Sequence, residues 1–204
     1  MISALVLAAG QGKRFGGTKQ LELVRGKPLV QHAVDAASEA GVDEVVVVLG
    51  HDAIRVRDAL VLPDRARFIV NERYAEGQST SLASGLRALD PASGSALVLL
   101  ADQPGIGAGH LRSLIEAYSD GGSEIVRIRF RDGPGPAILA RSVWDEASAL
   151  TGDTGARVLF EAQPGRVRWV TIDEDAPVDV DRRADLEGAR ANETPRPPSR
   201  PGRL

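Results

Sequence analysis

Four glycines and three cationic side chains lie close together near the start of the chain, in the stretch LVLAAGQGKRFGGTKQ (5–20). Glycines let backbone N–H groups approach an anion, and Lys13, Arg14 and Lys19 would offset the charge of a phosphate. The residue types therefore favour a phosphate-binding loop, and three cations suit a triphosphate. The alternative is an exposed, flexible loop whose lysines face water.

Two familiar phosphate motifs come close to this stretch, and neither is complete. The dinucleotide fingerprint G-x-G-x-x-G has two glycines at Gly10 and Gly12, but Phe15 stands in place of the third. The Walker pattern ends in G-K-[ST], whereas here the threonine precedes Lys19. A dinucleotide site also needs an acidic residue about twenty positions after the glycines, at the end of a second strand, and Asp35 falls within a predicted helix.

One carboxylate directly follows an apolar run. Asp102 comes after ALVLLA (96–101), which predicts a buried strand, so its side chain would stand at the edge of a parallel sheet where ligands bind. Mg²⁺ binds nucleotide phosphates through one or two carboxylates. Asp102 is therefore a candidate Mg²⁺ ligand, and a turn or cap ahead of Pro104 is the alternative.

Short aliphatic runs alternate with amphipathic stretches, and these elements must position the charged groups. The runs predict strands at 3–9, 44–50, 67–71, 96–102, 124–130 and 166–173. Helices are predicted over 28–40, with Pro28 at the first helical position, and over 79–90 and 109–119. The alternation indicates an α/β fold with three layers, α/β/α, around a mostly parallel, Rossmann-like sheet.

Length and composition narrow the class of protein. The 204 residues suffice for one core, and we expect a single domain over 1–191 followed by a disordered Pro/Arg-rich tail over 192–204. A net charge of −3 argues against nucleic acid or a membrane as the partner. The chain has no cysteine, and neither a signal peptide nor a membrane span is predicted, so we expect a cytoplasmic protein.

The histidines and tryptophans form no ligand pattern. His32, His51 and His110 are scattered along the sequence, whereas metal sites need clustered ligands, so we expect surface or packing roles for them. Trp144 and Trp169 lie among apolar neighbours and are expected in the core.

Four later segments accompany the glycine-rich stretch: EGQSTSLASGL (76–86), VLLADQPGI (98–106), LTGDTGARVLF (150–160) and VDVDRRADL (178–186). Together the five segments resemble the nucleotidyltransferases of the molybdopterin-nucleotide-transferase type, in the same order and over most of residues 3–187. The last two are similar to the G-D-x-G-A-R block and the closing motif of the molybdenum-cofactor cytidylyltransferase branch. In the family signature, Phe15 is an expected apolar anchor of the loop.

The resemblance implies a fold of the nucleotide-diphospho-sugar transferase type and transfer of CMP from CTP to molybdopterin or the molybdenum cofactor. An acceptor phosphate would attack the α-phosphorus in line and pyrophosphate would leave, with Mg²⁺ as the cofactor. The Ala-Ala-Gly start is similar to the cytidylyl branch, whereas the guanylyl branch usually has Ala-Gly-Gly. A molybdoenzyme or its chaperone is an implied partner.

The same resemblance assigns roles near the phosphates. Arg14, Lys19 and Asp102 would be catalytic, while Lys13 is a weaker candidate because the family tolerates many residues there. The nucleotide-binding residues would be Leu7, Ala8, Ala9, Gly10, Gly12, Arg14, Lys19, Gly77, Ser79 and Ser81. A helix N-terminus with Ser79 as its cap explains the serines equally well.

Asp102 and Asp181 would hold the metal. Arg182 and Arg183 replace the family's usual Thr-Pro beside Asp181. This departure leaves two alternatives, in which Asp179 serves as the ligand or Asp181 is a plain helix N-cap.

The acceptor is implied to bind at Gly133, Pro136, Asp153 and Arg157. Arg157 could hold the acceptor phosphate, and an ion pair with Asp153 or Glu161 is the alternative. Pro136 stands where the family has Asn or His, and a proline side chain offers an acceptor no hydrogen bond.

Two rival functions remain from the sequence. The same reaction could use a sugar- or polyol-phosphate acceptor, although ADQP (101–104) differs from the H-D-[AG]-A-R-P segment of the isoprenoid-pathway cytidylyltransferases. The other rival is a non-catalytic, nucleotide-binding accessory protein for a molybdoenzyme.

Overall fold

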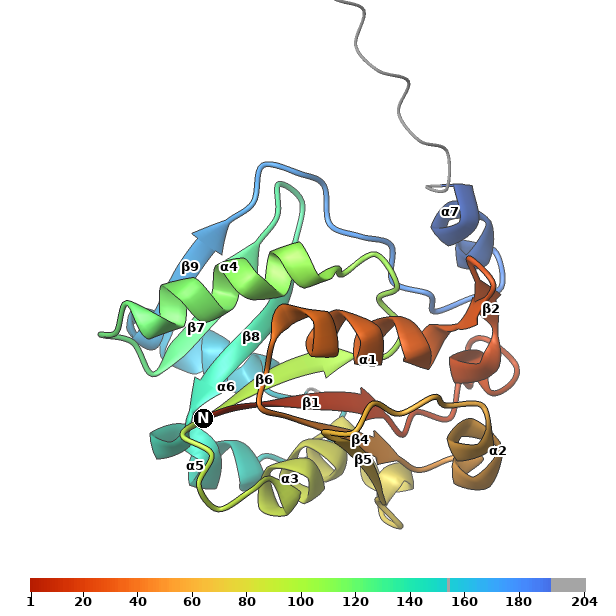
Figure 1. The fold of residues 1–204 in the computed structure, drawn as a ribbon, viewed down its shortest axis with the longest axis horizontal. Helices are drawn as coiled ribbons and strands as arrows, with labels where there is room; N and C mark the ends of the chain where they lie inside the picture. The colour runs from red at the N-terminus through yellow and green to blue at the C-terminus, as the bar shows by residue number, and fades with distance from the viewer. Residues whose placement is uncertain (154, 192–204) are drawn as a thin grey trace, which may run out of the picture.

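A seven-stranded sheet runs through the computed structural model, which describes residues 1–153 and 155–191 (Figure 1). The strand order is β5-β4-β1-β6-β8-β7-β9. The strands are β1 (Ile2–Ala8), β4 (Glu44–Leu49), β5 (Ala66–Val70), β6 (Ser95–Leu100), β7 (Ile125–Arg129), β8 (Pro134–Ala140) and β9 (Val167–Thr171). A separate two-stranded ribbon joins β2 (Leu23–Val24) to β3 (Lys27–Pro28).

The sheet is mixed but mostly parallel, as predicted. β1 pairs in parallel with both β4 and β6, and β7 pairs in parallel with β9. β8 is antiparallel to β6 and β7. β8 is absent from the strands predicted above, because Pro134, Gly135 and Pro136 are typical of turns. The six predicted strands lie within two residues of their observed bounds.

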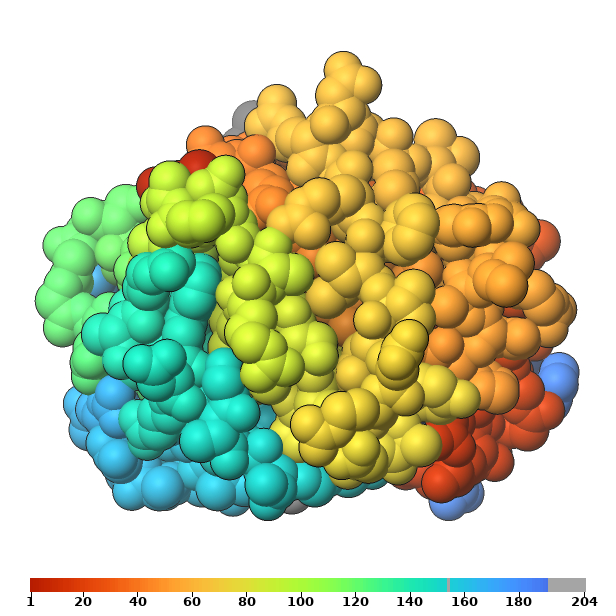
Figure 2. Space-filling model, turned by 90° about the horizontal axis from the view of Figure 1, so that it is seen from below, coloured from red at the N-terminus to blue at the C-terminus, as the bar shows by residue number. Residues whose placement is uncertain are grey.

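Helices cover both faces of the sheet. One face carries α1 (Leu29–Ala40), α2 (Ala53–Asp58) and α4 (Ala108–Ser119), and the other carries α3 (Gln78–Ala88), α5 (Trp144–Ser148) and α6 (Arg157–Ala162). Figure 2 shows the second face, with α3 and α5 side by side. Single 3-10 turns lie at Lys19–Leu21, Tyr74–Glu76, Arg141–Val143 and Pro164–Arg166. The predicted three-layer α/β/α fold is confirmed.

Alternating side chains of the strands build the two cores. In β1, Ala4 and Val6 pack with residues of α1 and α4, whereas Leu5 and Leu7 pack with residues of α3. This alternation follows from the period of two in a strand. Because both faces are covered, β1 is apolar at nearly every position, which is the pattern of a strand buried on both sides.

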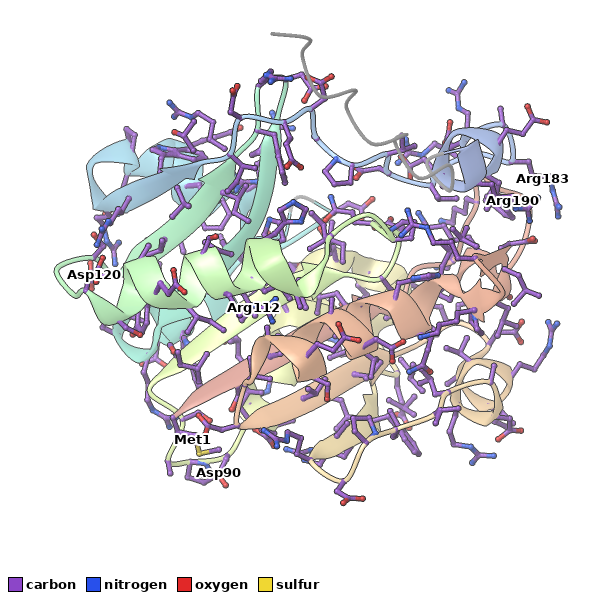
Figure 3. The ribbon with its side chains drawn as sticks, turned by 45° about the horizontal axis from the view of Figure 1, so that its top comes forward. Met1, Asp90, Arg112, Asp120, Arg183 and Arg190 are labelled. Carbon is purple, nitrogen blue, oxygen red and sulfur yellow. The ribbon has the colours of Figure 1, made fainter. Side chains whose placement is uncertain are left out.

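The last helix, α7 (Asp185–Ala191), lies beside β2, far along the chain from it (Figure 1). A third apolar cluster joins the two regions, with Phe15, Val24 and Leu29 on one side and Val180, Leu186 and Ala189 on the other. Figure 3 places Arg183 and Arg190 at this end of the molecule, away from Met1. The C-terminal segment therefore covers the N-terminal loop.

Three further expectations from the sequence concern the start of α1, membrane-spanning helices and the C-terminal tail. Pro28 precedes the first residue of α1, so it occupies the N-cap position and not the first helical position. In the part of the chain that the structure describes, no helix is long and apolar enough to cross a membrane. The predicted tail, 192–204, lies outside the described residues.

Candidate active site

A cleft of about 550 Å³ opens at the C-terminal ends of β1 and β6. This volume is ordinary for a small-molecule site. Three segments form it, namely the glycine-rich loop, the residues from Tyr74 to Ser81 and the end of β6 with Asp102, together with Asp153 and Asp181 from two later loops. The predicted residues that line it are Leu7, Ala9, Gly10, Gly12, Lys13, Arg14, Lys19, Gly77, Ser81, Asp102, Asp153 and Asp181.

The glycine-rich loop is closed by its own backbone. The carbonyl oxygen of Gly12 accepts hydrogen bonds from the N–H groups of Phe15 (3.0 Å) and Gly16 (2.8 Å). Gly12 has a φ of 59°, and a Cβ atom there would lie 2.0 Å from the carbonyl oxygen of Gly17. Only glycine fits this position, because any side chain would collide with rigid backbone.

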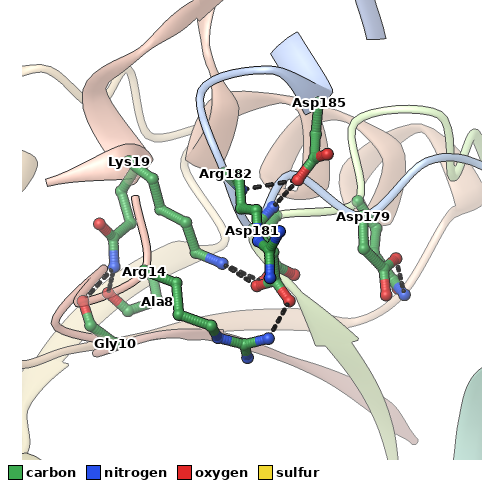
Figure 4. Close-up of polar contacts among 11 residues, drawn as sticks. Ala8, Gly10, Arg14, Lys19, Asp179, Asp181, Arg182 and Asp185 are labelled. Carbon is green, nitrogen blue, oxygen red and sulfur yellow. Dashed lines mark hydrogen bonds and ion pairs between the residues drawn. The ribbon is translucent and has the colours of Figure 1, made fainter. Parts of the chain in front are cut away.

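Gln20 fixes the two ends of the strand-to-loop junction. Its Nε2 donates to the carbonyl oxygens of Ala8 (3.1 Å) and Gly10 (2.7 Å), two residues that Figure 4 labels, and its side chain is almost fully buried. Gln20 was not predicted from the sequence, because the role of a buried amide depends on hydrogen-bond partners that come close to it only in the folded protein. Ala8, by contrast, is buried beneath the cleft and does not line it.

Phe15 anchors the loop from below. Only 3% of its surface is exposed, and it packs in the cluster that contains Val24, Leu29 and residues of the C-terminal segment. The prediction of an apolar anchor is confirmed. The residue that breaks the dinucleotide fingerprint therefore has a packing role that a glycine could not supply.

Lys19 lies between two carboxylates at the floor of the cleft (Figure 4). Its Nζ is 2.7 Å from Oδ2 of Asp102 and 3.0 Å from Oδ1 of Asp181, while a guanidinium nitrogen of Arg14 is 3.0 Å from Oδ2 of Asp181. Burial lowers the pKa of Lys19, but the two carboxylates, Asp102 above all, more than offset this, and its pKa stands above the ordinary value. Two cations and two anions thus balance at the centre of the cleft.

The carboxylates keep capacity for a further cation. Oδ1 of Asp102 is buried and has no hydrogen-bond partner among the described residues. The alternative ligand, Asp179, instead accepts a hydrogen bond from Nε2 of Gln103 (2.8 Å). Burial raises the pKa of Asp179, and the charges of Asp102 and Asp181 add to this, against the hydrogen bond from Gln103.

The donor set fits a hard divalent ion that keeps several waters. Among the residues that the structure describes, no group of three or more histidine, aspartate or glutamate side chains is arranged to hold a metal. An all-protein cage is therefore not present there, whereas Asp102 and Asp181 with water and phosphate oxygens match the preference of Mg²⁺.

Asp181 and Ser79 are not helix caps. The side chain of Asp181 faces Lys19 and Arg14, and it is Asp185 that accepts hydrogen bonds from the backbone N–H groups of Asp181 (2.9 Å) and Arg182 (2.6 Å). Helix α3 begins at Gln78 with Gly77 at the N-cap, so Ser79 already lies in the first turn and the capping interpretation is wrong.

The start of α3 contacts the loop before α6. The N–H of Ser79 donates to the carbonyl oxygen of Gly152 (3.2 Å), and the N–H of Gln78 donates to Oδ1 of Asp153 (3.2 Å). Gly77 has a φ of 122°, and a Cβ atom there would lie 2.4 Å from the carbonyl oxygen of Gly152. The hydroxyl of Ser79 is buried without a partner among the described residues, whereas Ser81 accepts a hydrogen bond from Asn71.

Only one of the four predicted acceptor residues lines the cleft, and that is Asp153. The exposed Arg157 pairs with Glu161 on the next turn of α6 (2.6 Å), which is one of the two alternatives that the sequence left open. The carbonyl of Gly133 accepts from the N–H of Phe130 (2.8 Å) in the β7–β8 hairpin, and Pro136 is buried within β8. Gly133 therefore belongs to the turn before β8 and Pro136 to β8 itself, and both serve the sheet.

Several cleft residues were not predicted. They are Gln11, Gln20, Tyr74, Ala75, Glu76, Gln78, Leu100 and Ala101. Leu100 and Ala101 could have been found, because they directly precede Asp102 at the strand end. Tyr74 could not, since no charge or spacing pattern marks an isolated tyrosine in a loop.

The histidines have packing roles, as predicted. His32 hydrogen-bonds the carbonyl of Val24, and His110 packs edge-on against Phe130. Trp144 is buried as expected, whereas Trp169 is only partly buried and lies under the guanidinium of Arg129, 4.2 Å from the ring centroid.

Comparison with known proteins identifies relatives over most of the chain. The family model described as MobA-like NTP transferase domain matches residues 4–167. The Nicotine blue oxidoreductase of Paenarthrobacter nicotinovorans is 33% identical over 191 residues, which cover 88% of this chain and 92% of that protein. The Bifunctional protein GlmU of Burkholderia thailandensis is 36% identical over 152 residues, and the chain spans about a third (32%) of its length.

Solved structures of similar fold include proteins with related sequences. Rv0371c of Mycobacterium tuberculosis superposes with a TM-score of 0.82 at 31% identity, over 93% of this chain and 97% of that one. A second structure of that protein is a complex with manganese, at 30% identity. A nucleotidyl transferase of Methanothermobacter has a TM-score of 0.80 at 25% identity, over 94% and 97% of the two chains.

Proposed function

The chain belongs to the MobA-like NTP transferases, a family of nucleotidyltransferases, and we propose that it transfers CMP from CTP to molybdopterin or the molybdenum cofactor with release of pyrophosphate. The observation that carries the proposal is Lys19 held between Asp102 and Asp181 at the floor of a glycine-lined cleft. Acceptor phosphate and triphosphate are both anionic, so the protein must mainly reduce repulsion and align the reactants.

The cations of the cleft carry this task. Arg14 and Lys19 would donate hydrogen bonds to the oxygens of the triphosphate and then stabilise the charge on the departing pyrophosphate. Arg14 is mostly exposed and Lys19 mostly buried, so they would reach the phosphates from the mouth and from the floor of the cleft. No side-chain nucleophile is required.

Asp102 and Asp181 would hold Mg²⁺, and the buried, unpartnered Oδ1 of Asp102 supports this assignment. The bound ion would supply neutralisation of charge on the phosphate oxygens. Lys19 would then exchange its carboxylate partners for phosphate oxygens.

The base and the acceptor would both bind near the start of α3, where the N–H of Gln78 donates to Asp153. Ala9 and Gly10 with Gly77 and Ser81 would surround the cytosine, and the Ala-Ala-Gly start supports CTP over GTP. The acceptor would bind on the side of Asp153. A sugar- or polyol-phosphate acceptor remains the alternative, because Pro136 is buried and offers no contact to a pterin.

A redox activity is a second candidate, favoured by the name of the relative that matches 88% of this chain. The glycine-rich loop argues against it, because Phe15 is buried where the dinucleotide fingerprint needs glycine. A paired lysine and two carboxylates also have no evident use in hydride transfer. Loss of NADH or NADPH absorbance with an artificial electron acceptor tests this candidate.

The proposal is tested by pyrophosphate release from CTP, GTP, ATP and UTP with Mg²⁺, with and without molybdopterin. We expect turnover with CTP only when the pterin is present. Asp102→Ala should reduce the rate by at least about a hundredfold, which is the usual effect of removing one group that stabilises transition-state charge. Asp173→Asn is the matched control, because this carboxylate is 91% exposed and does not line the cleft.

Two results would contradict the proposal. One is the absence of turnover with every triphosphate and with pterin, sugar-phosphate and polyol-phosphate acceptors alike, which would leave the non-catalytic accessory role. The other is an Asp102→Ala variant that binds and turns over CTP as the wild type does.

A further inference from the structure

A second hollow, of about 500 Å³, lies on the outer side of the glycine-rich loop. Gly17 and Thr18 line it, and Leu21 and Leu23 supply the apolar part of its lining. Three arginines that are far apart in the sequence, Arg55, Arg183 and Arg190, converge on it. No part of the mechanism above uses these arginines.

The hollow is basic. Three guanidinium groups and one carboxylate, that of Glu22, line it, so the lining carries a net positive charge. Arg183 is 3.7 Å from Glu22, near the limit of an ion pair. Arg55 is paired more firmly, with Asp52 outside the lining (2.7 Å). The lining thus carries more positive charge than its own carboxylate balances.

Arg190 is oriented by the backbone and not by a carboxylate. Its Nε and one terminal nitrogen donate to the backbone carbonyl of Leu23 (3.2 and 3.0 Å), and the structure describes no ion pair for it. The bonds orient the guanidinium at the rim of the hollow and leave its other N–H groups available. Figure 3 shows Arg183 and Arg190 at the same end of the molecule.

Guanidinium groups match the oxygens of a phosphate in geometry as well as charge. The apolar part of the lining would contact an organic portion, since Leu23 is 52% exposed. The volume is that of a small-molecule site and not of an extended macromolecular surface. The chemistry therefore selects a small, phosphate-bearing molecule with at least two negative charges.

The hollow and the cleft lie back to back on the same two short segments. In the first, Thr18 faces the hollow and Lys19 faces the cleft; in the second, Arg183 faces the hollow and Asp181 faces the cleft. The Lys19–Asp181 ion pair joins the two segments. A ligand that binds both Arg183 and Thr18 would therefore shift the two segments that carry Lys19 and Asp181.

We propose that this hollow is a regulatory site for a small phosphate-bearing molecule, distinct from the cleft, and that its occupancy weakens triphosphate binding in the cleft. An anion there adds negative charge beside Thr18, the chain neighbour of Lys19, and so opposes the attraction of the cleft's cations for a triphosphate. The proposal concerns a different site from the CTP assignment, and its binding test does not depend on that assignment.

Pyrophosphate, followed by isothermal titration calorimetry at low salt, is the probe for the site. We expect two sites in the wild type. Arg183→Gln should raise the Kd of one of them about tenfold, the effect of losing one charge-assisted hydrogen bond. Lys19→Gln should remove the other. Arg182→Gln is the matched control, because Arg182 adjoins Arg183 and does not line the hollow.

Arg190→Gln provides a second variant whose substitution leaves Arg183 and Glu22 in place, and circular dichroism shows whether each variant keeps the fold. One result would refute the site. The wild type would bind a single pyrophosphate, Lys19→Gln would abolish that binding, and Arg183→Gln and Arg190→Gln would leave it unchanged.

The linkage is tested by the Kd of CTP at increasing concentrations of inorganic phosphate. Phosphate should raise this Kd less in Arg183→Gln than in the wild type and Arg182→Gln, because only competition within the cleft remains. Identical phosphate dependence in all three proteins would overturn the regulatory role.

Discussion

Replacing Lys19 with methionine removes the cation between Asp102 and Asp181 while keeping a side chain of similar length. Lys19 is 12% exposed and makes contacts of 2.7 and 3.0 Å to the two carboxylates. Its loss leaves two carboxylates facing each other with Arg14 as their remaining ion-pair partner. We therefore expect Lys19→Met to destabilise the fold.

The magnitude follows from two opposing effects. Each hydrogen bond to a charged group contributes about 1.5–3 kcal/mol. Methionine avoids the cost of burying an ammonium group, and Asp181 is 37% exposed, so solvent weakens the second contact. The net loss in the free energy of unfolding should be about 2–3 kcal/mol, below the range of about 3–5 kcal/mol for breaking a fully buried pair.

Urea unfolding at neutral pH measures this loss, with the slope of the transition as a check on two-state behaviour. Lys13→Met is the matched control: Lys13 lines the same cleft, the structure describes no ion pair for it, and its replacement should change stability by less than about 0.5 kcal/mol. Equal effects of the two variants would refute the argument that Lys19 is held by the carboxylates.

The pH dependence gives an independent check. The folded pKa of Lys19 stands above its ordinary value of 10.5, so its contribution is fully present below pH 10.5 and is lost as the pH rises through the folded pKa. The difference in stability between wild type and Lys19→Met should therefore be constant from neutral pH to about 10 and shrink above it. A difference that shrinks between pH 7 and 9 would contradict this.

Three further predictions concern the frame of the cleft. Phe15→Ala should lower the free energy of unfolding by about 3–5 kcal/mol because Phe15 is buried; a loss below about 1 kcal/mol in urea would contradict the anchor role. Gly77→Ala should weaken CTP binding, measured by calorimetry, because its Cβ would lie 2.4 Å from the carbonyl oxygen of Gly152, whereas Gly107→Ala has open space and should bind normally. The backbone N–H groups of Arg182 and Asp181 hold the pKa of Asp185 below its ordinary 3.8, so its stabilising effect on α7 is present above that pH and lost as the pH falls through the folded value. Hydrogen exchange of α7 should accordingly separate wild type from Asp185→Ala at pH 6 and not in strong acid, and a separation that persists there would refute this.

The sequence was sufficient where one segment alone determines the outcome. Asp102 follows an apolar strand, and the strand end is where ligands bind, so its place in the cleft could be predicted without contacts. Arg14 and Lys19 belong to one glycine-rich loop, which made their proximity equally predictable. The fold class followed from the alternation of strands and helices.

The sequence was insufficient where a residue's environment comes from distant segments. Pro134, Gly135 and Pro136 indicate a turn locally, yet pairing with β6 and β7 makes them part of a strand. The role of Gln20 depends on two carbonyl groups that are aimed at it only after the loop has closed. Arg157 could equally have held a phosphate or Glu161, and only the exposed geometry of α6 shows the ion pair.

The cluster of Phe15, Leu29, Val180 and Leu186 has a consequence for the order in which the protein is completed during synthesis. The glycine-rich loop leaves the ribosome well before Asp181, the partner of Lys19, which follows 162 residues later. Contacts across such separations form late, because the intervening chain must first be brought together. The loop is therefore translated before the strands it precedes and yet is among the last parts to acquire its final surroundings, and a nascent chain ending before residue 180 would contain the sheet but lack a finished cleft.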